Sequence, residues 1–328
     1  MASPSKEGEI TSQVIDKDIH KSNGLLLYFH NYSFYSQKVI MALYEKKLPF
    51  RTKTVDLTSG EQFSPWFIEL NPLCQVPVLK DGVKIIPDSS RIIDYLEDNL
   101  SNGTPRLVPH DQGSEMRVKV THYRTLLDEM PIGLITKGSL FHPEFIKNPL
   151  HPYTGSFRNK FEEFVRSKGA KVRELAALEG NTDVKEKLLN LAKSQEEEEA
   201  KWSKKEDYSS ALDDVDLVLD QIENELRNHE EMDDWWLCSD RFTLADISLS
   251  LFLDRLNNVG LSHRFWGDGK RPLLENYFNR VRQRESYLKT IPSSQANSYL
   301  DLSSNILVGS VVFLVVVTIF FYFKRKSK

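Results

Sequence analysis

A proline interrupts a strand-like run, and a helix that begins on an acidic residue and two serines follows soon after. The run is Cys74-Gln75-Val76-Pro77-Val78-Leu79, and the helix starts at Asp88-Ser89-Ser90. Because proline lacks the N–H that a β-ladder needs, Pro77 cannot lie inside a central strand. A helix start offers free N–H groups and the positive end of the helix dipole, which suit a carboxylate. The same residue types cap helices, so ligand binding and capping are both open at Asp88 and Ser89.

A second helix start has a simpler, structural interpretation. Thr243 is expected to cap a helix, and Asp246, three residues later, completes a capping box. The helix that follows, "LADISLSLFLDRL", is expected to be buried, with Leu244, Ile247, Leu251 and Phe252 inside.

Other patterns of chemistry are absent from the sequence. There is no Gly-rich phosphate loop, and His110, His122, His142 and His151 lack the spacing of metal ligands. Two cysteines, Cys74 and Cys238, exclude a disulfide framework and fit a reducing compartment. A net charge of −4 gives no reason to expect nucleic acid as a partner.

The elements that must position these residues come in the order strand, helix, strand, hairpin, helix within residues 24–101. The strands are expected at Leu25–Phe29, Phe50–Val55, Val76–Leu79 and Val83–Ile86, and the last helix at Asp88–Leu100. This order predicts a small mixed sheet with helices packed on it. Residues 110–292 carry helical patterns only. Within them, residues 145–207 include a long charged stretch from Arg158 to Asp207, whose sparse apolar positions predict exposed helices.

The two ends of the chain differ in character. Residues 1–23 lack an apolar region and are interpreted as a mobile tail without a signal peptide. Residues 293–305 form a polar linker to Ile306–Phe323, a stretch without any charge that reaches roughly 27 Å as a helix, and a basic tail follows at residues 324–328. We expect Ile306–Phe323 to be a transmembrane helix, so that the chain is tail-anchored with its bulk facing the cytosol.

The arrangement resembles that of the glutathione transferases, an α/β thioredoxin-like N-terminal domain followed by an all-α C-terminal domain. Gln75–Leu79 is similar to the family's strand with a cis proline, Asp88-Ser89 to its acid–serine pair, and Phe242–Asp246 to its helical capping motif. Within this fold the chain is identified as a member of the ganglioside-induced differentiation-associated protein family. That narrower resemblance is carried by Thr121–Pro131, Phe141–Glu144, Phe265–Val281, the charged insertion and the C-terminal span.

The resemblance implies a glutathione-like ligand. If the bond before Pro77 is cis, the backbone of Val76 is free to pair with the ligand's cysteinyl part as an added strand. Ser89 would then take the γ-glutamyl carboxylate, and Asp88 the ammonium group. Ser33 lies where serine-type transferases stabilise the thiolate, with Tyr32, Tyr35 and Ser36 as competitors. Ser33 is also a natural N-cap, and both roles stay open.

Cys74 departs from the transferase pattern, because many transferases have glycine there. Its side chain would crowd the site, form a mixed disulfide as a redox sensor, or lie buried as an ordinary thiol.

The family resemblance implies residence in the mitochondrial outer membrane and a role in mitochondrial fission and network organisation. We expect a non-catalytic organiser, modulated by glutathione or a related ligand and without a resident cofactor. The alternative is an active membrane-anchored transferase that conjugates glutathione to electrophiles with Ser33 at the thiolate. A protein partner at residues 145–207 and a homodimer are further expectations. A lipid-contacting basic face at Arg271, Arg280, Arg282 and Arg284 is a weaker hypothesis than a solvated one.

Overall fold

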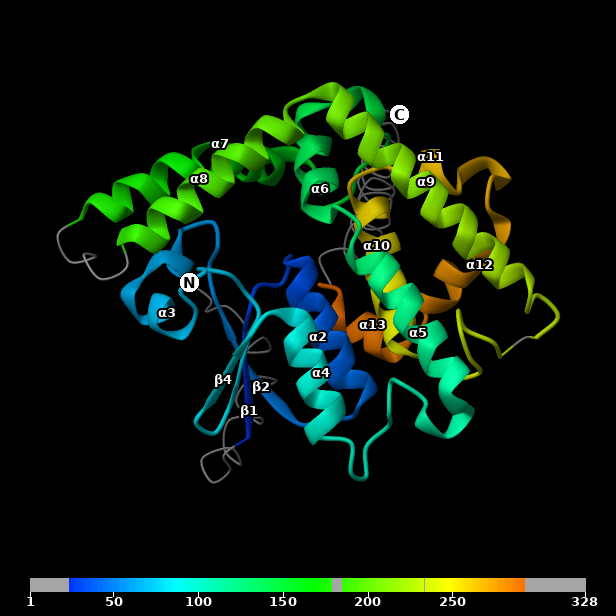
Figure 1. Ribbon diagram of the computed structural model, residues 1–328. Coiled ribbons are helices and arrows are strands. Elements are labelled where there is room, and N and C mark those ends of the chain that lie inside the picture. The colour runs from blue at the N-terminus through cyan, green and yellow to red at the C-terminus, as the bar shows by residue number, and fades with distance from the viewer. Residues whose placement is uncertain (1–23, 179–184, 233, 293–328) are drawn as a thin grey trace, which may run out of the picture.

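A four-stranded mixed sheet forms the centre of the N-terminal domain (Figure 1). The computed structural model describes residues 24–178, 185–232 and 234–292. The strand order is β2-β1-β3-β4, in which β1 pairs parallel with β2 and antiparallel with β3, and β3 pairs antiparallel with β4. The strands are β1 (Leu25–Phe29), β2 (Phe50–Thr54), β3 (Val78–Asp81) and β4 (Lys84–Pro87).

The two faces of this sheet are covered by different helices. Leu25, Leu27 and Phe29 of β1 belong to the main core together with α2 (Phe34–Glu45) and α4 (Ser89–Asn99). Tyr28 lies on the other face with Phe67 of the short helix α3 (Pro65–Leu70), which follows a 3₁₀ turn at Glu61–Phe63. Successive side chains of β1 lie on opposite faces of the sheet because side chains alternate along a strand with a period of two residues.

The hairpin lies further along the chain than the sequence pattern predicts. β3 begins at Val78, because Pro77 and Val76 stay outside the ladder, and the turn consists of Gly82 and Val83. Gly82 has a positive φ of 58°, which a tight two-residue turn requires. Val83 is consequently exposed rather than part of the strand.

The C-terminal domain is all helical and is built around one buried helix. This helix is α10 (Leu244–Asn258), and apart from Asn257 each of its residues is buried. Around it lie α5, α6, α9, α12 and the short helices α11 and α13, with 3₁₀ turns at His110–Gln112, Pro143–Phe145 and Gly267–Gly269. The helix bounds are Gly113–Asp128 (α5), Ile132–Phe141 (α6), Lys205–Arg227 (α9), Ser262–Phe265 (α11), Pro272–Val281 (α12) and Glu285–Thr290 (α13).

The start of α10 is held by a carboxylate that satisfies four donors. Asp246 Oδ2 accepts from the backbone N–H and the hydroxyl of Thr243, at 2.8 and 2.7 Å. Its Oδ1 accepts from the Leu237 N–H and the Tyr277 hydroxyl, at 2.9 and 2.8 Å. Burial raises the pKa of Asp246, while these hydrogen bonds oppose the shift. The capping box therefore connects three segments of the helical domain.

The charged insertion forms helices that are exposed over most of their length, as the sequence predicts, but it also contributes a small buried cluster that the sequence does not predict. It folds into α7 (Gly155–Ala177) and α8 (Lys185–Trp202), which run side by side from the helical domain to α3 (Figure 1). Val172, Ala176, Leu188 and Ala192 form a buried cluster with Phe63, Ile68 and Cys74 of the N-terminal domain. The docking was not predicted because these few apolar residues are enough to hold a helix pair against the N-terminal domain.

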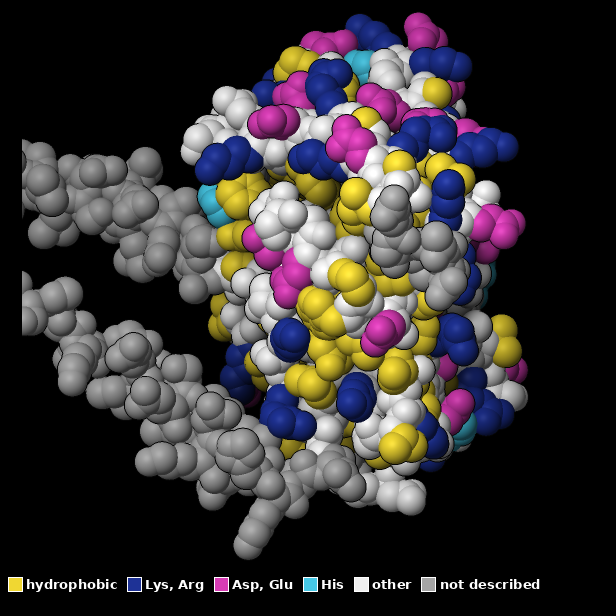
Figure 2. Space-filling view, turned by 90° about the vertical axis from the view of Figure 1, so that its left-hand side faces the viewer, with side chains coloured by type: hydrophobic (Ala, Val, Ile, Leu, Met, Phe, Trp, Pro, Cys, Tyr) yellow, Lys and Arg dark blue, Asp and Glu magenta, His cyan; other side chains and the backbone are white. Residues whose placement is uncertain are grey.

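The outer surface of this region is mixed in charge. Figure 2 shows Lys and Arg side chains among Asp and Glu side chains over the upper part of the face, where α7 and α8 lie. Hydrophobic side chains gather lower down, at the level of the thioredoxin-like domain.

No helix within the described ranges is both long and apolar enough to cross a membrane. The expected mobile tail (residues 1–23), linker, transmembrane helix (residues 306–323) and basic tail lie outside the described residues.

Candidate functional site

The sheet brings the residues singled out in the N-terminal domain to one end. Tyr28, near the end of β1, pairs with Val78 at the start of β3, and Val78 pairs with Pro87 at the end of β4. Three segments therefore meet at the same end of the sheet (the sheet edge): Val76 before β3, the loop after β1 that leads to Ser33, and Asp88-Ser89 after β4. The sequence alone gave no register for this gathering.

Val76 presents an unpaired backbone at this edge. The Val76–Pro77 bond is cis. The Val76 side chain is buried on the α3 face of the sheet, with Phe67 and Val78. Its backbone N–H and C=O form no hydrogen bond to the rest of the described chain. An extended peptide can therefore add to this edge as a short strand.

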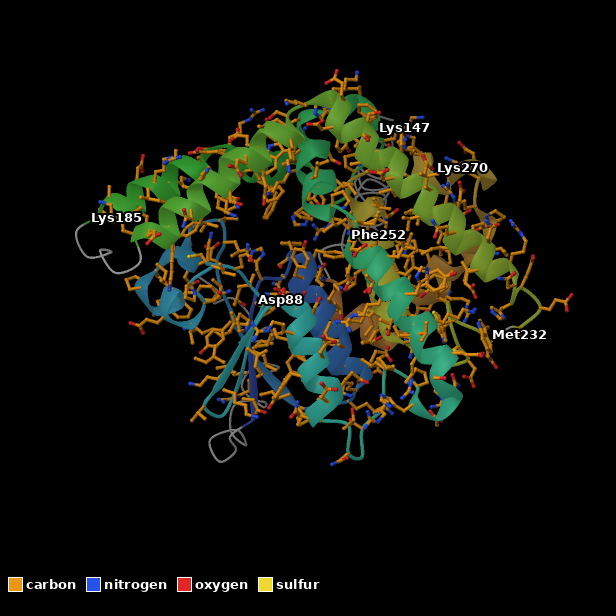
Figure 3. The ribbon with its side chains drawn as sticks, in the orientation of Figure 1. Asp88, Lys147, Lys185, Met232, Phe252 and Lys270 are labelled. Atoms are coloured by element: carbon orange, nitrogen blue, oxygen red, sulfur yellow. The ribbon has the colours of Figure 1, made fainter. Side chains whose placement is uncertain are left out.

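Asp88 caps α4, and the Ser89 hydroxyl beside it is left without a hydrogen-bond partner in the described part of the chain. Asp88 Oδ1 accepts from the backbone N–H groups of Ser90 and Arg91, each at 3.0 Å, so that Asp88 is the N-cap of α4. Asp88 also has a positive φ of 75°, a strained conformation of the kind that functional sites often hold. Ser89 is the first residue of α4 and is buried; its hydroxyl forms no hydrogen bond within the described part of the chain. In Figure 3, Asp88 lies at the start of α4, below α7 and α8.

Ser33 is the N-cap of α2. Its Oγ accepts from the Ser36 backbone N–H at 3.3 Å, and the residue also lines a cavity. A hydroxyl that accepts one bond still has its own proton to donate to a thiolate. Of the three competitors, Tyr32 and Tyr35 line the same cavity, whereas Ser36 is fully buried and accepts from the His30 N–H.

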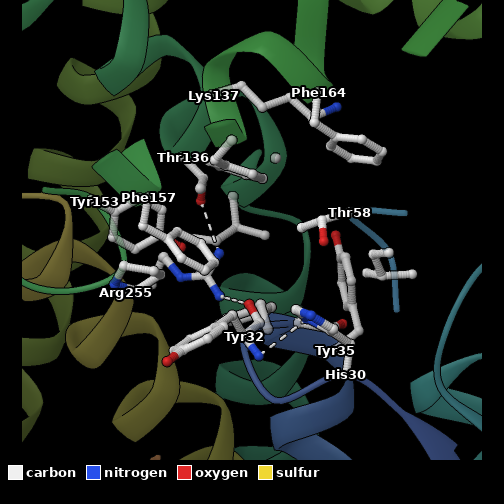
Figure 4. A pocket seen from close by; sticks show the side chains of 17 residues that line it. His30, Tyr32, Tyr35, Thr58, Thr136, Lys137, Tyr153, Phe157, Phe164 and Arg255 are labelled. Atoms are coloured by element: carbon white, nitrogen blue, oxygen red, sulfur yellow. Dashed lines mark hydrogen bonds between the residues drawn. The ribbon is translucent and has the colours of Figure 1, made fainter. Parts of the chain in front are cut away.

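The cavity has a volume of about 200 Å³ and lies between the β1–α2 loop, α6, α7 and α10 (Figure 4). Its walls are rich in aromatic side chains from both domains: Tyr32, Phe34, Tyr35, Tyr153, Phe157, Phe161 and Phe164. Val76, Asp88 and Ser89 are not among its lining residues. The structure therefore separates the free sheet edge from the apolar cavity, and Ser33 belongs to the cavity.

Arg255 is the functional candidate that the sequence interpretation missed. It lies on α10 with its guanidinium in the cavity wall, where it donates to Thr136 Oγ1 at 3.2 Å and to the Tyr32 carbonyl at 2.9 Å (Figure 4). The sequence spacing could have identified it: Arg255 follows Leu251 by four residues, which places it on the buried face of the helix.

Cys74 is covered by the insertion. It is 4% exposed, and it packs with Val172, Ala176, Leu188 and Ala192. Burial raises the pKa of its thiol to about 11, an effect that the nearby Lys168 only partly offsets. Burial also lowers the pKa of Lys168 to about 8, and the charge of Lys137 adds to that shift. Of the three hypotheses for Cys74, this environment favours an ordinary buried thiol.

Comparisons with known proteins agree with this geometry. Residues 32–99 match the family model "Glutathione S-transferase, N-terminal domain", and residues 182–285 match "Glutathione S-transferase, C-terminal domain". A solved structure of the β-etherase LigF from Sphingobium superposes with a TM-score of 0.58 at 22% identity, covering 81% of this chain and 98% of that one. The fold and the two family-model matches together define a protein with the glutathione transferase fold.

The sequence comparisons narrow this class. The human "Ganglioside-induced differentiation-associated protein 1-like 1" is 34% identical over 280 residues, covering 81% of this chain and 73% of that protein. The mouse counterpart is 33% identical over 283 residues, and "Glutathione S-transferase TCHQD" of Arabidopsis thaliana is 26% identical over 265. The chain belongs to the ganglioside-induced differentiation-associated protein family.

Proposed function

We propose that the protein is a tail-anchored organiser of the mitochondrial outer membrane, with its bulk facing the cytosol, that acts in mitochondrial fission and network organisation. Glutathione or a related thiol peptide modulates this role by binding at the sheet edge, and the chain works as a homodimer. The observation that carries the ligand part is the unpaired Val76 backbone beside the cis proline, next to the start of α4. The membrane part is supported by the uncharged stretch Ile306–Phe323.

The ligand fits this edge step by step. Its cysteinyl unit pairs with the N–H and C=O of Val76 as an added strand. Its γ-glutamyl carboxylate lies at the N-terminus of α4, where the Ser89 hydroxyl and the helix dipole stabilise negative charge. The Asp88 oxygen not used in capping accepts from the ligand's ammonium.

Conjugation is the second candidate function. It is favoured by one observation: Ser33 lies at the start of α2 and also lines the aromatic cavity, where an electrophile would meet the ligand's sulfur. The Ser33 hydroxyl would donate to the thiolate, and the apolar aromatic walls would reduce the access of water.

Calorimetric titration of glutathione into the full chain in detergent tests the ligand part. We expect binding that Ser89→Ala weakens by about tenfold, because a hydrogen bond to a charged group is lost. Ser90→Ala is the matched control, a neighbouring serine of the same helix, and it should bind as the unchanged protein does. No heat at millimolar glutathione would remove the ligand from the proposal.

Turnover of a chromogenic aryl halide separates the two functions. The organiser proposal predicts no conjugation above the rate without protein. Conjugation that disappears in Ser33→Ala, with glutathione binding preserved, would establish the transferase instead.

A further inference from the structure

Arg255 is a buried cation without a matching anion. Four Lys and Arg residues of the described chain are buried: Lys38, Lys46, Arg255 and Arg271. The other three each contact a carboxylate: Lys38 pairs with Asp128, Lys46 with Glu97 at 2.6 Å and Arg271 with Asp220 at 2.7 Å. Arg255 is 8% exposed, and no carboxylate of the described residues lies within ion-pair distance of it.

The acidic neighbour on the same helix is engaged elsewhere. Asp254 accepts from the Tyr287 hydroxyl through one oxygen and from Asn258 through the other. Burial raises the pKa of Asp254 to about 6, and the charge of Arg255 opposes this shift only in part. The charge on Arg255 is therefore left without a direct counterion.

The surroundings hold the guanidinium in place and leave it facing apolar space. Thr136 and the Tyr32 carbonyl accept two of its five N–H groups. The Phe34 and Tyr153 rings each lie 5.7 Å from it. Partial burial raises the pKa of the half-exposed Tyr35 and the charge of Arg255 lowers it, so this tyrosine also lies in the field of the arginine. A buried charge is costly unless it is paired, and a planar guanidinium matches a carboxylate.

We propose that this cavity binds a small aromatic monocarboxylate whose carboxylate pairs with Arg255 and whose ring lies among the aromatic walls. The volume of about 200 Å³ suits one ring with a short arm, since about 150 Å³ of apolar cavity is enough for benzene. The ring gains edge-to-face contacts with Phe157 and its aromatic neighbours. The site is separate from the sheet edge, and its test needs no glutathione.

Three probes that share the same ring and chain length, and differ only in the charge of the end group, test the charge requirement. They are titrated into the full-length, unsubstituted protein in detergent. The probes are 3-phenylpropionate, the neutral 3-phenylpropanamide and the cationic 3-phenylpropylamine, each titrated without glutathione. We expect the carboxylate to bind at least about tenfold more tightly than the amide, and the amine not at all, because only the carboxylate supplies the missing charge. Equal affinities of acid and amide would overturn the proposal.

Variants then assign the effect to Arg255. Arg255→Met keeps the length and removes the charge; it should abolish the preference for the acid over the amide while the amide still binds. Arg255→Lys should retain part of the preference, because the charge remains without the planar fork. Arg264→Met is the matched control, an arginine that pairs with Asp213 outside the cavity, and it should bind as the unchanged protein does. An undiminished preference in Arg255→Met would overturn the assignment, and the probe series still decides the proposal should that variant fail to fold.

Discussion

Lys47 holds a backbone conformation that glycine adopts more easily. Its φ is 54°, and it follows the last turn of α2. The Lys47 N–H bonds to the Tyr44 carbonyl and the Leu48 N–H to the Leu43 carbonyl, the two bonds of a Schellman ending. The side chain of Lys47 is exposed and contributes little packing.

Lys47→Gly should therefore stabilise the protein. Removing the Cβ relieves the left-handed strain, and we expect the free energy of unfolding to rise by about 0.5–1 kcal/mol in urea denaturation. Lys47→Ala removes the same long side chain but keeps the Cβ, and it should give no such gain. Equal effects of the two substitutions would assign the change to the side chain rather than to the backbone.

The Cys74 thiol should be almost unreactive at neutral pH. With a pKa of about 11, fewer than about one thiol in a thousand is ionised at pH 7.4, and the thiolate is the reactive form. Alkylation of Cys74, followed by peptide mass spectrometry, should be roughly a hundredfold slower in the folded protein than in urea. The rate should rise about tenfold for each pH unit towards pH 11. Fast alkylation at pH 7.4 would restore the redox-sensor hypothesis.

At the scale of elements, α7 and α8 show how few contacts dock a helix pair. Most of their charged residues are exposed, as the sequence indicates, with pairs such as Arg173–Glu196 on the surface. Val172 and Leu188 are nearly fully buried against the Cys74 region. The apolar stripe is too sparse to distinguish from chance in the sequence.

Val172→Asp should loosen this contact, because it places a charge in a buried apolar cluster. We expect Cys74 to become alkylated faster, while Cys238, which is buried among the main core residues, stays protected. The two thiols thus report local and global opening separately.

Leu189→Asp is the matched control for this experiment. Leu189 lies beside Leu188 on α8 but is 37% exposed, so a charge there should leave Cys74 protected. Equal exposure of Cys74 and Cys238 in Val172→Asp would mean that the whole protein unfolds, and the docking interpretation would then be wrong.

At the scale of the molecule, the two domains share one core and are joined by ion pairs. Lys38 of α2 pairs with Asp128 of α5, and Glu45 of α2 accepts from Arg284 and Ser286 at α13. Arg284 makes this contact, and Arg271 is buried in its pair with Asp220, so the hypothesis of a basic lipid-facing surface loses two of its four residues. The membrane contact is proposed for the C-terminal span instead.

Deleting residues 306–323 should release the protein from membranes. Without the apolar span, the chain should move from the pellet to the supernatant in carbonate extraction of mitochondria, and it should no longer alter the length of mitochondria in imaged cells.

Neutralising Lys324, Arg325 and Lys326 is the control for this deletion, because it leaves the span intact. That variant should stay in the pellet, and imaging then shows whether it still resides on mitochondria. A deleted chain that remains in the pellet would contradict the tail anchor.

The sequence by itself determined the features that depend on neighbours along the chain. Pro77 ends a ladder because it has no N–H, Asp246 caps α10 from three residues away, and hydrophobic periods order the strands and helices. These effects act within one or two turns, so a pattern reveals them. The start of β3 lies two residues later than the sequence predicts, because strand pairing rather than residue propensity sets where a strand begins.

Only the tertiary structure decided which distant residues meet. The bond from Arg255 to the Tyr32 carbonyl spans 223 positions, and the cluster at Cys74 joins α3 to an insertion about a hundred residues later. The sheet register gathers Val76, Asp88 and the Ser33 loop at one edge. Contacts of this kind depend on packing and burial, which local spacing does not encode.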